Sequence, residues 1–505
     1  MRMKILIFLL ITFCTINGNS QIIEATLTKE FAIKQDYNLK QDFNFKFLKI
    51  GDYYYRGEIN IDYLEFYRIK DLSKRKFVLA IRQYDKDMVE KKVFLFNNGE
   101  PISLPYLPYL FSQKDKLCIM HYNYEGNENI RNFISRINTN DMTLDVTKEI
   151  ETVDKQPIIG NNFETTYSPD GSKQLLTFSG EKMISTLIID DNMNISQLSK
   201  LSVPKKLKFE VFSTCLDKNG NKYFTYAYKE DVNDDYQKSG IGVEKKDGKV
   251  SFDDFIESKL ALDMYLPRLK NSKDGSKVYL EGSYALQNDK AGLYDGIALI
   301  TFNPANAQMD KPKLFPYPDD LKEKLYRWDM ANKKKGVIAV FRAKYELNEL
   351  DNGTIVLSGY LGKIEQITGS VMAIFITKEN KVKFSMVPRS QRGWTIPTVA
   401  TIPYNNKIIV IYATNEKNLT KDPTEKPSSD DVHKEMCMAA AIFDENGNLQ
   451  DRKLILQKPG KDRYYALNMS TYYSSNSLII PIIKDRKNMI DYYMEFYGFV
   501  DLKVK

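Results

Sequence analysis

Two histidines, His121 and His433, are the side chains of this sequence best suited to acid–base or metal chemistry near neutral pH. A zinc site needs several ligands that converge on one point, and two widely separated histidines do not supply that set. The sequence contains neither the Gly-x-Ser-x-Gly turn of a serine hydrolase nor a glycine-rich phosphate loop before a helix. His121 lies in the alternating run 117–122 and His433 in the polar segment 421–435. We therefore interpret both as structural residues and predict no metal site, catalytic residue or cofactor.

Two short segments, 217–221 and 444–448, place oxygen-bearing side chains at alternate positions, as calcium-binding loops do. In the calcium loop of an EF-hand, glycine stands at the sixth position and glutamate at the twelfth. Here glycine is fourth in each segment, as Gly220 and Gly447. An Asn-Gly hairpin turn explains both segments without an ion, so calcium binding is the less favoured alternative.

Carboxylates are plentiful, and two of them facing each other could hydrolyse a glycosidic bond. Such a pair is defined by its separation in space, not by its spacing along the chain. The adjacent acids Asp234-Asp235 and Asp319-Asp320 stand in polar segments that are typical of solvated charge. The sequence therefore nominates no catalytic pair.

One segment gathers side chains that could bind a ligand: Arg389, Gln391, Arg392 and Trp394. A tryptophan ring between guanidinium and amide groups can stack on a sugar or an aromatic ligand. We predict these four residues as the ligand-binding surface. In the alternative interpretation Trp394 packs between structural units and the arginines are solvated.

Short β-strands joined by tight turns are the elements that must position these residues. Asn-Gly and Asp-Gly pairs, the strongest local signal for a hairpin, recur at positions 98–99, 170–171, 219–220, 247–248, 274–275, 352–353 and 446–447. Short apolar or alternating runs flank them, and the 33 tyrosines and 27 phenylalanines suit the half-buried face of a sheet. Helical periodicity is confined to Asp319–Trp328 and, more weakly, Asp253–Ala261, which we predict as short surface helices. The chain is predicted to be all-β.

The spacing of the turns predicts a β-propeller. Gly171, Gly220 and Gly275 are 49 and 55 residues apart, close to the length of one four-stranded blade, and the gaps to Gly353 and Gly447 are 78 and 94. We interpret these four gaps as one, one, two and two blades. Together with the residues on either side of them, this predicts seven blades, or eight in the alternative count, over residues 21–505. Closing the sheets into a ring would protect their strand edges. Two tandem β-sandwiches are the rival, but no Pro-, Gly- or Ser-rich linker divides the chain.

Two turns resemble the Ser-Pro-Asp-Gly hairpin of exported TolB-type and WD40-like propellers: 167–173, which reads Tyr-Ser-Pro-Asp-Gly-Ser-Lys, and the weaker copy 271–277. From about residue 335 the chain also resembles uncharacterised exported proteins of Bacteroidota. Three elements match: a Gly-x-Ile-Val strand at 353–359, the segment Val-Pro-Arg-Ser-Gln at 387–391, and the segment 412–418. In the second element Arg389 replaces a lysine, and in the third Thr414 replaces an acid. The resemblance implies a propeller fold and export, and it implies no activity.

The N-terminus is typical of a signal peptide, with Arg2 and Lys4 before an apolar run from Ile5 to Phe13 that is too short to span a bilayer. We predict cleavage after Ser20, so that residues 1–20 form the signal peptide. Lipidation at Cys14 is the alternative, disfavoured because bulky Phe13 precedes it. No later transmembrane segment is expected, and we predict a periplasmic or extracellular location, with the periplasm preferred.

Charge and cysteine content exclude several classes of protein. Loss of residues 1–20 lowers the net charge from +7 to +5, and because acidic and basic residues interleave we expect no nucleic-acid partner. Cys118, Cys215 and Cys437 are too few and too scattered for a disulfide framework, so we expect buried thiols or at most one pair.

Two functions remain open. The favoured one is a non-catalytic, monomeric binding or scaffold protein of the cell envelope whose partner is an envelope protein or a glycan. The alternative is a glycosidase-type enzyme whose carboxylates converge from different blades at the central channel. Propellers support both functions, so the fold alone does not choose between them.

Overall fold

The structure is a computed structural model, and the part of the chain that it describes is discontinuous. The described ranges are 22–27, 33–36, 47–60, 76–96, 102–103, 108–124, 130–150, 162–179, 183–202 except 197, 207–229, 238–254, 262–286, 296–321, 346–362, 367–392, 399–431 except 423–424 and 426–427, 436–460, 463–467, 471–487 and 492–505. The predicted signal peptide, Cys14, His433 and Trp394 lie outside these ranges.

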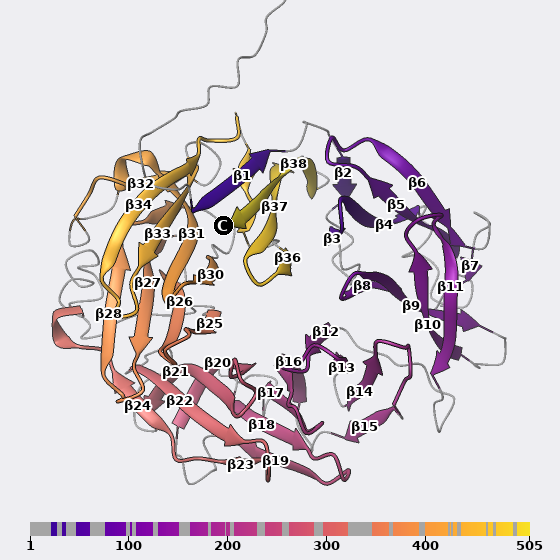
Figure 1. The fold of residues 1–505 in the computed structure, drawn as a ribbon, viewed down its shortest axis with the longest axis horizontal. Helices are drawn as coiled ribbons and strands as arrows, with labels where there is room; N and C mark the ends of the chain where they lie inside the picture. Colours follow the sequence, from indigo (N-terminus) through magenta and orange to yellow (C-terminus); the bar gives the residue numbers. More distant parts are fainter. Residues whose placement is uncertain are drawn as a thin grey trace, which may run out of the picture.

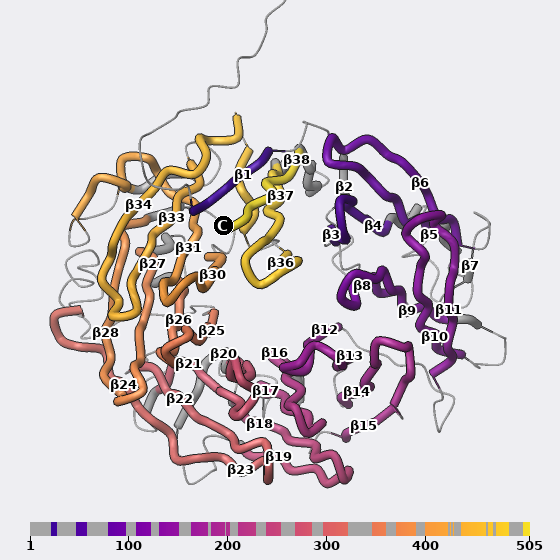
Figure 2. Tube along the Cα trace, in the orientation of Figure 1, coloured from indigo at the N-terminus to yellow at the C-terminus, as the bar shows by residue number. Residues whose placement is uncertain are grey.

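The described strands form eight sheets around a common axis (Figures 1 and 2). The fold is an eight-bladed β-propeller, which confirms the predicted fold class at the larger of the two blade counts. We number the blades along the chain. In blades 1 to 7 the first strand lies nearest the axis and the next strands along the chain lie further out.

Blades 1 to 4 occupy the first half of the chain. Blade 1 comprises β3 (Leu48–Ile50), β4 (Tyr53–Asn60), β5 (Lys76–Tyr84), β6 (Glu90–Leu95) and β7 (Ile102–Ser103). Blade 2 comprises β8 (Tyr109–Gln113), β9 (Lys116–Tyr124), β10 (Ile130–Asn138) and β11 (Thr143–Ile150). Blade 3 comprises β12 (Asn162–Tyr167), β13 (Lys173–Ser179), β14 (Met183–Asp190) and β15 (Ser199–Ser202). Blade 4 comprises β16 (Leu207–Leu216), β17 (Lys222–Lys229), β18 (Lys238–Glu244) and β19 (Val250–Asp254).

Blades 5 to 7 follow in order. Blade 5 comprises β20 (Leu262–Asn271), β21 (Val278–Leu286), β22 (Gly296–Asn303), β23 (Gln308–Met309) and β24 (Lys313–Pro316). Blade 6 comprises β25 (Glu346–Glu349), β26 (Ile355–Gly362), β27 (Ile367–Ile376), β28 (Val382–Val387) and β29 (Ser390–Arg392). Blade 7 comprises β30 (Ala400–Tyr404), β31 (Lys407–Asn415), β33 (Met436–Phe443) and β34 (Leu449–Leu456). Between β31 and β33 the chain forms the short helix η3 (Glu416–Asn418) and then β32 (Ser429–Asp431), which pairs with β29 of blade 6 in parallel.

Blade 8 joins the two ends of the described chain. Its inner strands are β35 (Tyr464–Tyr465), β36 (Thr471–Ser474), β37 (Ser477–Lys487) and β38 (Tyr492–Val504), and its outermost strands are β1 (Ile23–Leu27) and β2 (Ile33–Asp36). β1 pairs with β38 from Ile23 opposite Val504 to Leu27 opposite Val500, and β2 continues along the same strand. The backbone hydrogen bonds of β38 thus close the ring.

A buried ion pair strengthens this closure from the side of blade 1. The ammonium group of Lys49 in β3 pairs with Asp501 in β38, and the two side chains are only 9% and 13% exposed. Tyr473 also donates a hydrogen bond to Asp501, and its ring lies 4.4 Å from the Lys49 ammonium. These contacts fix blade 1 against blade 8.

The apolar core consists of layers between neighbouring blades. In β31, Ile408, Val410 and Tyr412 pack toward blade 6, whereas Ile409, Ile411 and Ala413 pack toward blade 8. Because the middle strands are covered on both faces, they appear in the sequence as continuous apolar runs. Outer strands are exposed and charged instead, as in β11, and charge on an edge strand discourages pairing with another molecule.

Aspartate side chains organise several of the hairpin turns. Oδ1 of Asp217 accepts hydrogen bonds from the backbone N–H groups of Asn219 and Asn221 at 2.8 and 2.9 Å, and Oδ2 accepts one from Asn221 Nδ2 at 2.7 Å. Gly220 has a φ of +90°, the left-handed position that completes this type of turn. The turn at 444–448 has the same pattern of hydrogen bonds. The carboxylates are satisfied by hydrogen-bond donors, which supports the hairpin interpretation over calcium.

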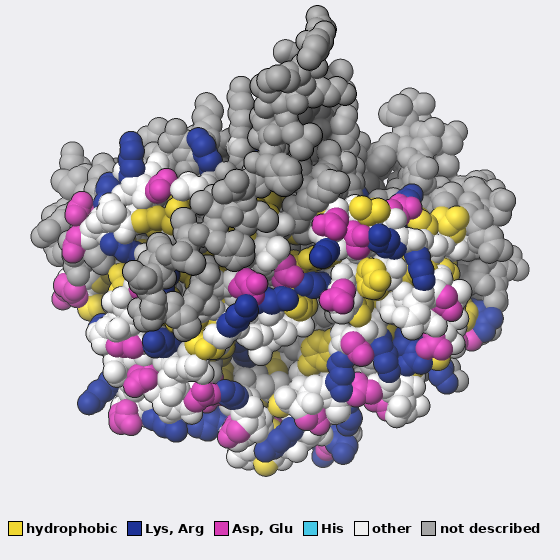
Figure 3. All heavy atoms as spheres, turned by 45° about the horizontal axis from the view of Figure 1, so that its top comes forward, with side chains coloured by type: hydrophobic (Ala, Val, Ile, Leu, Met, Phe, Trp, Pro, Cys, Tyr) yellow, Lys and Arg dark blue, Asp and Glu magenta, His cyan; other side chains and the backbone are white. Residues whose placement is uncertain are grey.

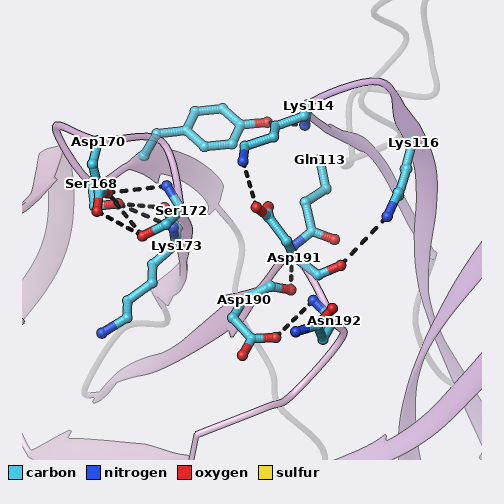
Figure 4. A network of polar contacts seen from close by, with 11 residues as sticks. Gln113, Lys114, Lys116, Ser168, Asp170, Ser172, Lys173, Asp190, Asp191 and Asn192 are labelled. Carbon is cyan, nitrogen blue, oxygen red and sulfur yellow. Dashed lines mark hydrogen bonds and ion pairs between the residues drawn. The ribbon is translucent and has the colours of Figure 1, made fainter.

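Neighbouring blades are also joined through these turns, as Figure 4 shows for blades 2 and 3. Gln113 Nε2 donates to the carbonyl oxygen of Asp190 at 2.7 Å, and the ammonium of Lys114 pairs with Asp191. In the same view Asp170 accepts hydrogen bonds from the hydroxyl groups of Ser168 and Ser172 within its own turn. The hydroxyl of Ser168, followed by the Ser172 groups, lowers the pKa of Asp170 to about 2, so this turn keeps its charge at any ordinary pH.

The structure corrects two details of the sequence analysis. Gly275 and Gly353 both mark the first hairpin of a blade, so the gap of 78 residues spans blade 5 alone and not two blades. Gly447 marks the last hairpin of blade 7, and the first hairpins of blades 1, 2, 7 and 8 contain neither Asn-Gly nor Asp-Gly. Asp253 and Asp254 end strand β19 rather than beginning a helix, whereas residues 319–321 form a helical turn where one was predicted.

We expect Asp501→Asn to destabilise the protein by about 3 kcal/mol, because it leaves the Lys49 ammonium buried without its counter-ion. Urea unfolding followed by fluorescence measures this loss. The double variant Lys49→Met, Asp501→Asn should be more stable than Asp501→Asn alone, since no unpaired charge remains.

The matched control is Asp247→Asn, which breaks the exposed pair between Asp247 and Lys249, where the side chains are 53% and 80% exposed. That change should leave the stability of the protein almost unchanged, because solvent screens the exposed pair. Equal effects of the two aspartate variants would contradict the role of Asp501 in ring closure.

Candidate functional site

The innermost strands of blades 5 to 8 bring a set of polar side chains together near the axis. A hydrogen bond 2.9 Å long runs from the Tyr472 hydroxyl in blade 8 to Glu346 Oε2 in blade 6, two blades away. The same hydroxyl accepts a hydrogen bond of 2.8 Å from the backbone N–H of Thr401 in blade 7, which lies between them. A side chain can bridge non-adjacent blades only close to the axis, where β25, β30 and β36 approach one another (Figure 1).

Further contacts extend this set to blade 5. The ammonium of Lys270 in β20 donates hydrogen bonds to the Leu347 carbonyl oxygen at 2.6 Å and to Asn348 Oδ1 at 2.9 Å. On the other side of β25, the Ser358 and Thr401 hydroxyl groups lie 2.5 Å apart. We call the members of this set the axial cluster: Lys270, Glu346, Asn348, Ser358, Thr401 and Tyr472.

Lys270 and Tyr472 reach solvent and Glu346 is half-buried, whereas Asn348, Ser358 and Thr401 are buried. The Tyr472 side chain is 40% exposed, and Lys270 is exposed as well. Their polar ends are enclosed by the surrounding strands, and this burial raises the pKa of Tyr472 and lowers the pKa of Lys270. Burial also raises the pKa of Glu346, an effect opposed by the hydrogen bond from Tyr472 and by the charge of Lys270. The cluster therefore combines exposed surface with groups whose ionisation is shifted, as binding and catalytic sites often do.

A second unusual carboxyl group, Glu281, lies in β21 of blade 5. Glu281 is 1% exposed and stands opposite Arg268 in the β20–β21 ladder. Within the described residues neither of its carboxyl oxygens has a hydrogen-bond partner, and burial raises its pKa to about 8 against the opposing charge of Arg268. Glu244, at the junction of blades 3 and 4, differs because Lys222 contacts both of its carboxylate oxygens at 3.0 Å. Glu281 is thus a carboxyl group held uncharged at neutral pH.

The predicted ligand surface lies at the junction of blades 6 and 7. Arg389 is 2% exposed, and its Nε donates a hydrogen bond of 2.7 Å to the Ala413 carbonyl oxygen of β31, so its guanidinium is engaged in a contact between blades. Gln391 and Arg392 belong to β29, where they stand opposite Asp430 and Asp431 of β32. Trp394 lies outside the described residues. Binding at these four residues stays a prediction.

The remaining candidates for chemistry have structural roles. His121 lies in β9, hydrogen-bonds to the Ser135 hydroxyl at 2.8 Å, and has its pKa lowered to about 4 by burial. It is therefore a neutral residue of the strand, as its sequence pattern predicts. Cys118, Cys215 and Cys437 are buried free thiols, the favoured of the two expectations for the cysteines.

The described surface has no single dominant charge. Figure 3 shows lysine and arginine side chains interleaved with aspartate and glutamate over the face in view. Among the described residues no group of three histidine, cysteine or carboxylate side chains could hold a metal ion. A search of the same residues finds no helix long and apolar enough to cross a membrane.

Comparisons with known proteins show similarity at the level of fold. No protein-family description matches the sequence, and no curated protein matches it. Among solved structures, the WD40 domain of SCAP from fission yeast is 9% identical with a TM-score of 0.37, and the alignment covers 90% of this chain and 96% of that one. A DUF4221 family member from Bacteroides vulgatus is 11% identical with a TM-score of 0.29, covering 79% and 92%. An α-L-arabinofuranosidase from Clostridium thermocellum is 10% identical with a TM-score of 0.28, covering 59% and 95%.

The axial cluster has no signal in the sequence, because its members are divided among five strands of blades 5 to 8 and lie up to 202 positions apart, from Lys270 to Tyr472. The members share a common position only when the blades are aligned by their first hairpin turns. Glu346, Thr401 and Tyr472 each lie three or four residues before the first hairpin turn of their blade. They therefore occupy similar heights along the axis.

We expect the stability of the protein to fall as the pH rises between about 4.5 and 8 because of Glu281. In this range the unfolded chain carries an ionised Glu281 while the folded protein must keep it protonated, since the folded pKa is raised from 4.5 to about 8. The loss amounts to about 1.4 kcal/mol per pH unit and ends above the folded pKa. Urea unfolding of wild type and Glu281→Gln across this range measures it.

The stability difference between Glu281→Gln and wild type should grow in favour of the variant up to about pH 8 and then stay constant. Glu445→Gln, a change in a turn of blade 7, is the control and should show no such trend. A difference that is independent of pH would show that Glu281 ionises normally in the folded protein.

Proposed function

We propose that this protein is a non-catalytic binding protein of the cell envelope and that the axial cluster is its ligand site. The hydrogen bond from Tyr472 to Glu346 across the intervening blade carries the proposal. It fixes an exposed aromatic ring beside a carboxyl group and an ammonium group that come from different blades. Polar groups held at fixed positions around an aromatic surface are the usual composition of a ligand site.

The rigidity of the cluster supports binding. The Tyr472 hydroxyl is held both by Glu346 and by the backbone of Thr401, so its ring cannot turn away without losing two hydrogen bonds. A preorganised site pays little conformational entropy when its ligand arrives. The N-terminal sequence adds the envelope location, because residues 1–20 are typical of an export signal. An envelope protein or a glycan is accordingly the proposed partner.

Capture from a solubilised envelope fraction tests this function. Immobilised wild type should retain a partner or glycan that Glu346→Gln retains at least about tenfold less, because a hydrogen bond to a charged or acidic group contributes roughly 1.5–3 kcal/mol. Glu149→Gln makes the same chemical change on the outer strand β11 and should retain as much as wild type. Capture that is equal for all three proteins, or absent for wild type, would refute the axial site.

Glycoside hydrolysis is a second candidate, favoured by one observation. Burial raises the pKa of Glu346, as it does for the general acid of a glycosidase. Such an enzyme needs a second carboxylate within about 5–10 Å. The charge that acts on the pKa of Glu346 is that of the Lys270 ammonium, and the second carboxylate of such an enzyme is unassigned.

A panel of 4-nitrophenyl glycosides separates the two candidates. For a binding protein we expect no release of nitrophenolate above the buffer rate. Release by wild type that Glu346→Gln abolishes and Glu149→Gln preserves would establish the enzyme and overturn the non-catalytic proposal.

A further inference from the structure

The positive charge at the axial cluster lacks a direct partner. The two acceptors of the Lys270 ammonium, the Leu347 carbonyl and Asn348 Oδ1, are both neutral. Among the described residues no carboxylate lies within ion-pair distance of Lys270, although its side chain is exposed. This differs from the buried lysines Lys49 and Lys222, each of which pairs with a carboxylate. An ammonium has three donors, so one remains for an incoming group.

The electrostatics of the surroundings favour an anion as that group. The acid whose charge acts on Lys270 is Glu346, which already accepts the hydrogen bond from Tyr472 and whose ionisation is shifted by burial toward the neutral form. Burial likewise lowers the pKa of Lys270, which means that the ammonium has lost part of its solvation. A ligand anion would restore that stabilisation, and such charge-assisted hydrogen bonds are about twice as strong as neutral ones.

Around this charge the cluster offers groups that suit ring hydroxyls. Tyr472 is 40% exposed while its hydroxyl is fixed, so part of a rigid aromatic residue is open to contact with a ligand. The half-buried Glu346 carboxyl group accepts the hydrogen bond from the Tyr472 hydroxyl, whereas the Thr401 and Ser358 side chains are buried and bond to each other. Aromatic stacking combined with several fixed hydrogen-bonding groups matches a sugar ring better than it matches an extended peptide or a lipid.

We propose that the axial cluster binds a carbohydrate that bears carboxylate groups, such as a chain of uronic acid units. Lys270 pairs with the carboxylate, the Tyr472 ring packs against the face of the sugar, and Glu346 binds hydroxyl groups. This inference rests on the proposed function and adds the chemical class of the ligand.

Isothermal titration calorimetry with a purified oligogalacturonate of about six units tests the inference. The matched ligand is the same oligomer after methyl esterification, which keeps the sugar backbone and removes the charge. We expect the acid to bind and the ester to bind at least about tenfold more weakly, the equivalent of one charge-assisted hydrogen bond. Raising the salt concentration should weaken binding of the acid and leave the ester unaffected.

Protein variants locate the charge. Lys270→Gln should lower the affinity for the acid about tenfold and leave the affinity for the ester unchanged, whereas Lys270→Arg should retain most of the preference for the acid. Lys277→Gln, in the exposed turn of the same blade, should bind as wild type does. Thermal unfolding of each variant confirms that it is folded.

The outcomes separate this inference from the proposed function. Equal binding of acid and ester, or no effect of Lys270→Gln, overturns the carboxylate inference but leaves the axial site standing if Glu346→Gln still reduces binding. Absence of binding to either oligomer also overturns the inference, and the capture experiment then decides the proposed function separately. Capture of a protein in place of a glycan, dependent on Glu346, would assign the axial site to a different class of partner.

Discussion

Every sheet of this molecule depends on how the unpaired N–H and C=O groups of its edge strands are satisfied. A ring of blades leaves one junction where the chain ends must meet, and here β38 provides it by carrying β1 and β2 on its outer edge. The pairing links residues about 480 positions apart, so that blade 8 contains strands from both the first and the last part of the described chain. The ion pair between Lys49 and Asp501 adds a side-chain contact where blade 1 meets blade 8. Without this closure the positions of the blades relative to one another would not be fixed.

The type of contact between blades changes with distance from the axis. Continuous apolar runs such as β31 and β33 fill the layers between blades, where both faces of a strand are covered. Closer to the axis, buried polar groups join blade to blade, and farther out the charged edge strands face solvent. The hairpin turns then tie neighbouring blades together through hydrogen bonds such as that from Gln113 to Asp190. The rigid frame that results allows single side chains on different blades to meet with defined geometry.

The axial cluster shows what this frame makes possible. Tyr472 reaches across blade 7 to Glu346, and Lys270 reaches from blade 5 to the backbone of blade 6. The cluster thus presents an aromatic surface, an acidic group and an ammonium without a direct counter-ion within one region. Elsewhere in blade 5, the buried Glu281 is a carboxyl group that stays protonated at neutral pH. Binding of a polar, acidic ligand is the function that this combination of shape and charge supports best.

The sequence by itself determined the class of fold, because hairpin turns and strand periodicity are local properties. The turns at Gly171, Gly220 and Gly275 follow from the left-handed backbone that glycine tolerates, and their spacing indicates a blade length. The exact number of blades did not follow, since turns built from other residues, such as Asn405-Asn406, mark blades equally well. The candidate site was beyond the reach of the sequence for a different reason. Lys270, Glu346, Thr401 and Tyr472 carry no local motif, and only the closure of the ring brings their strands to the same point on the axis.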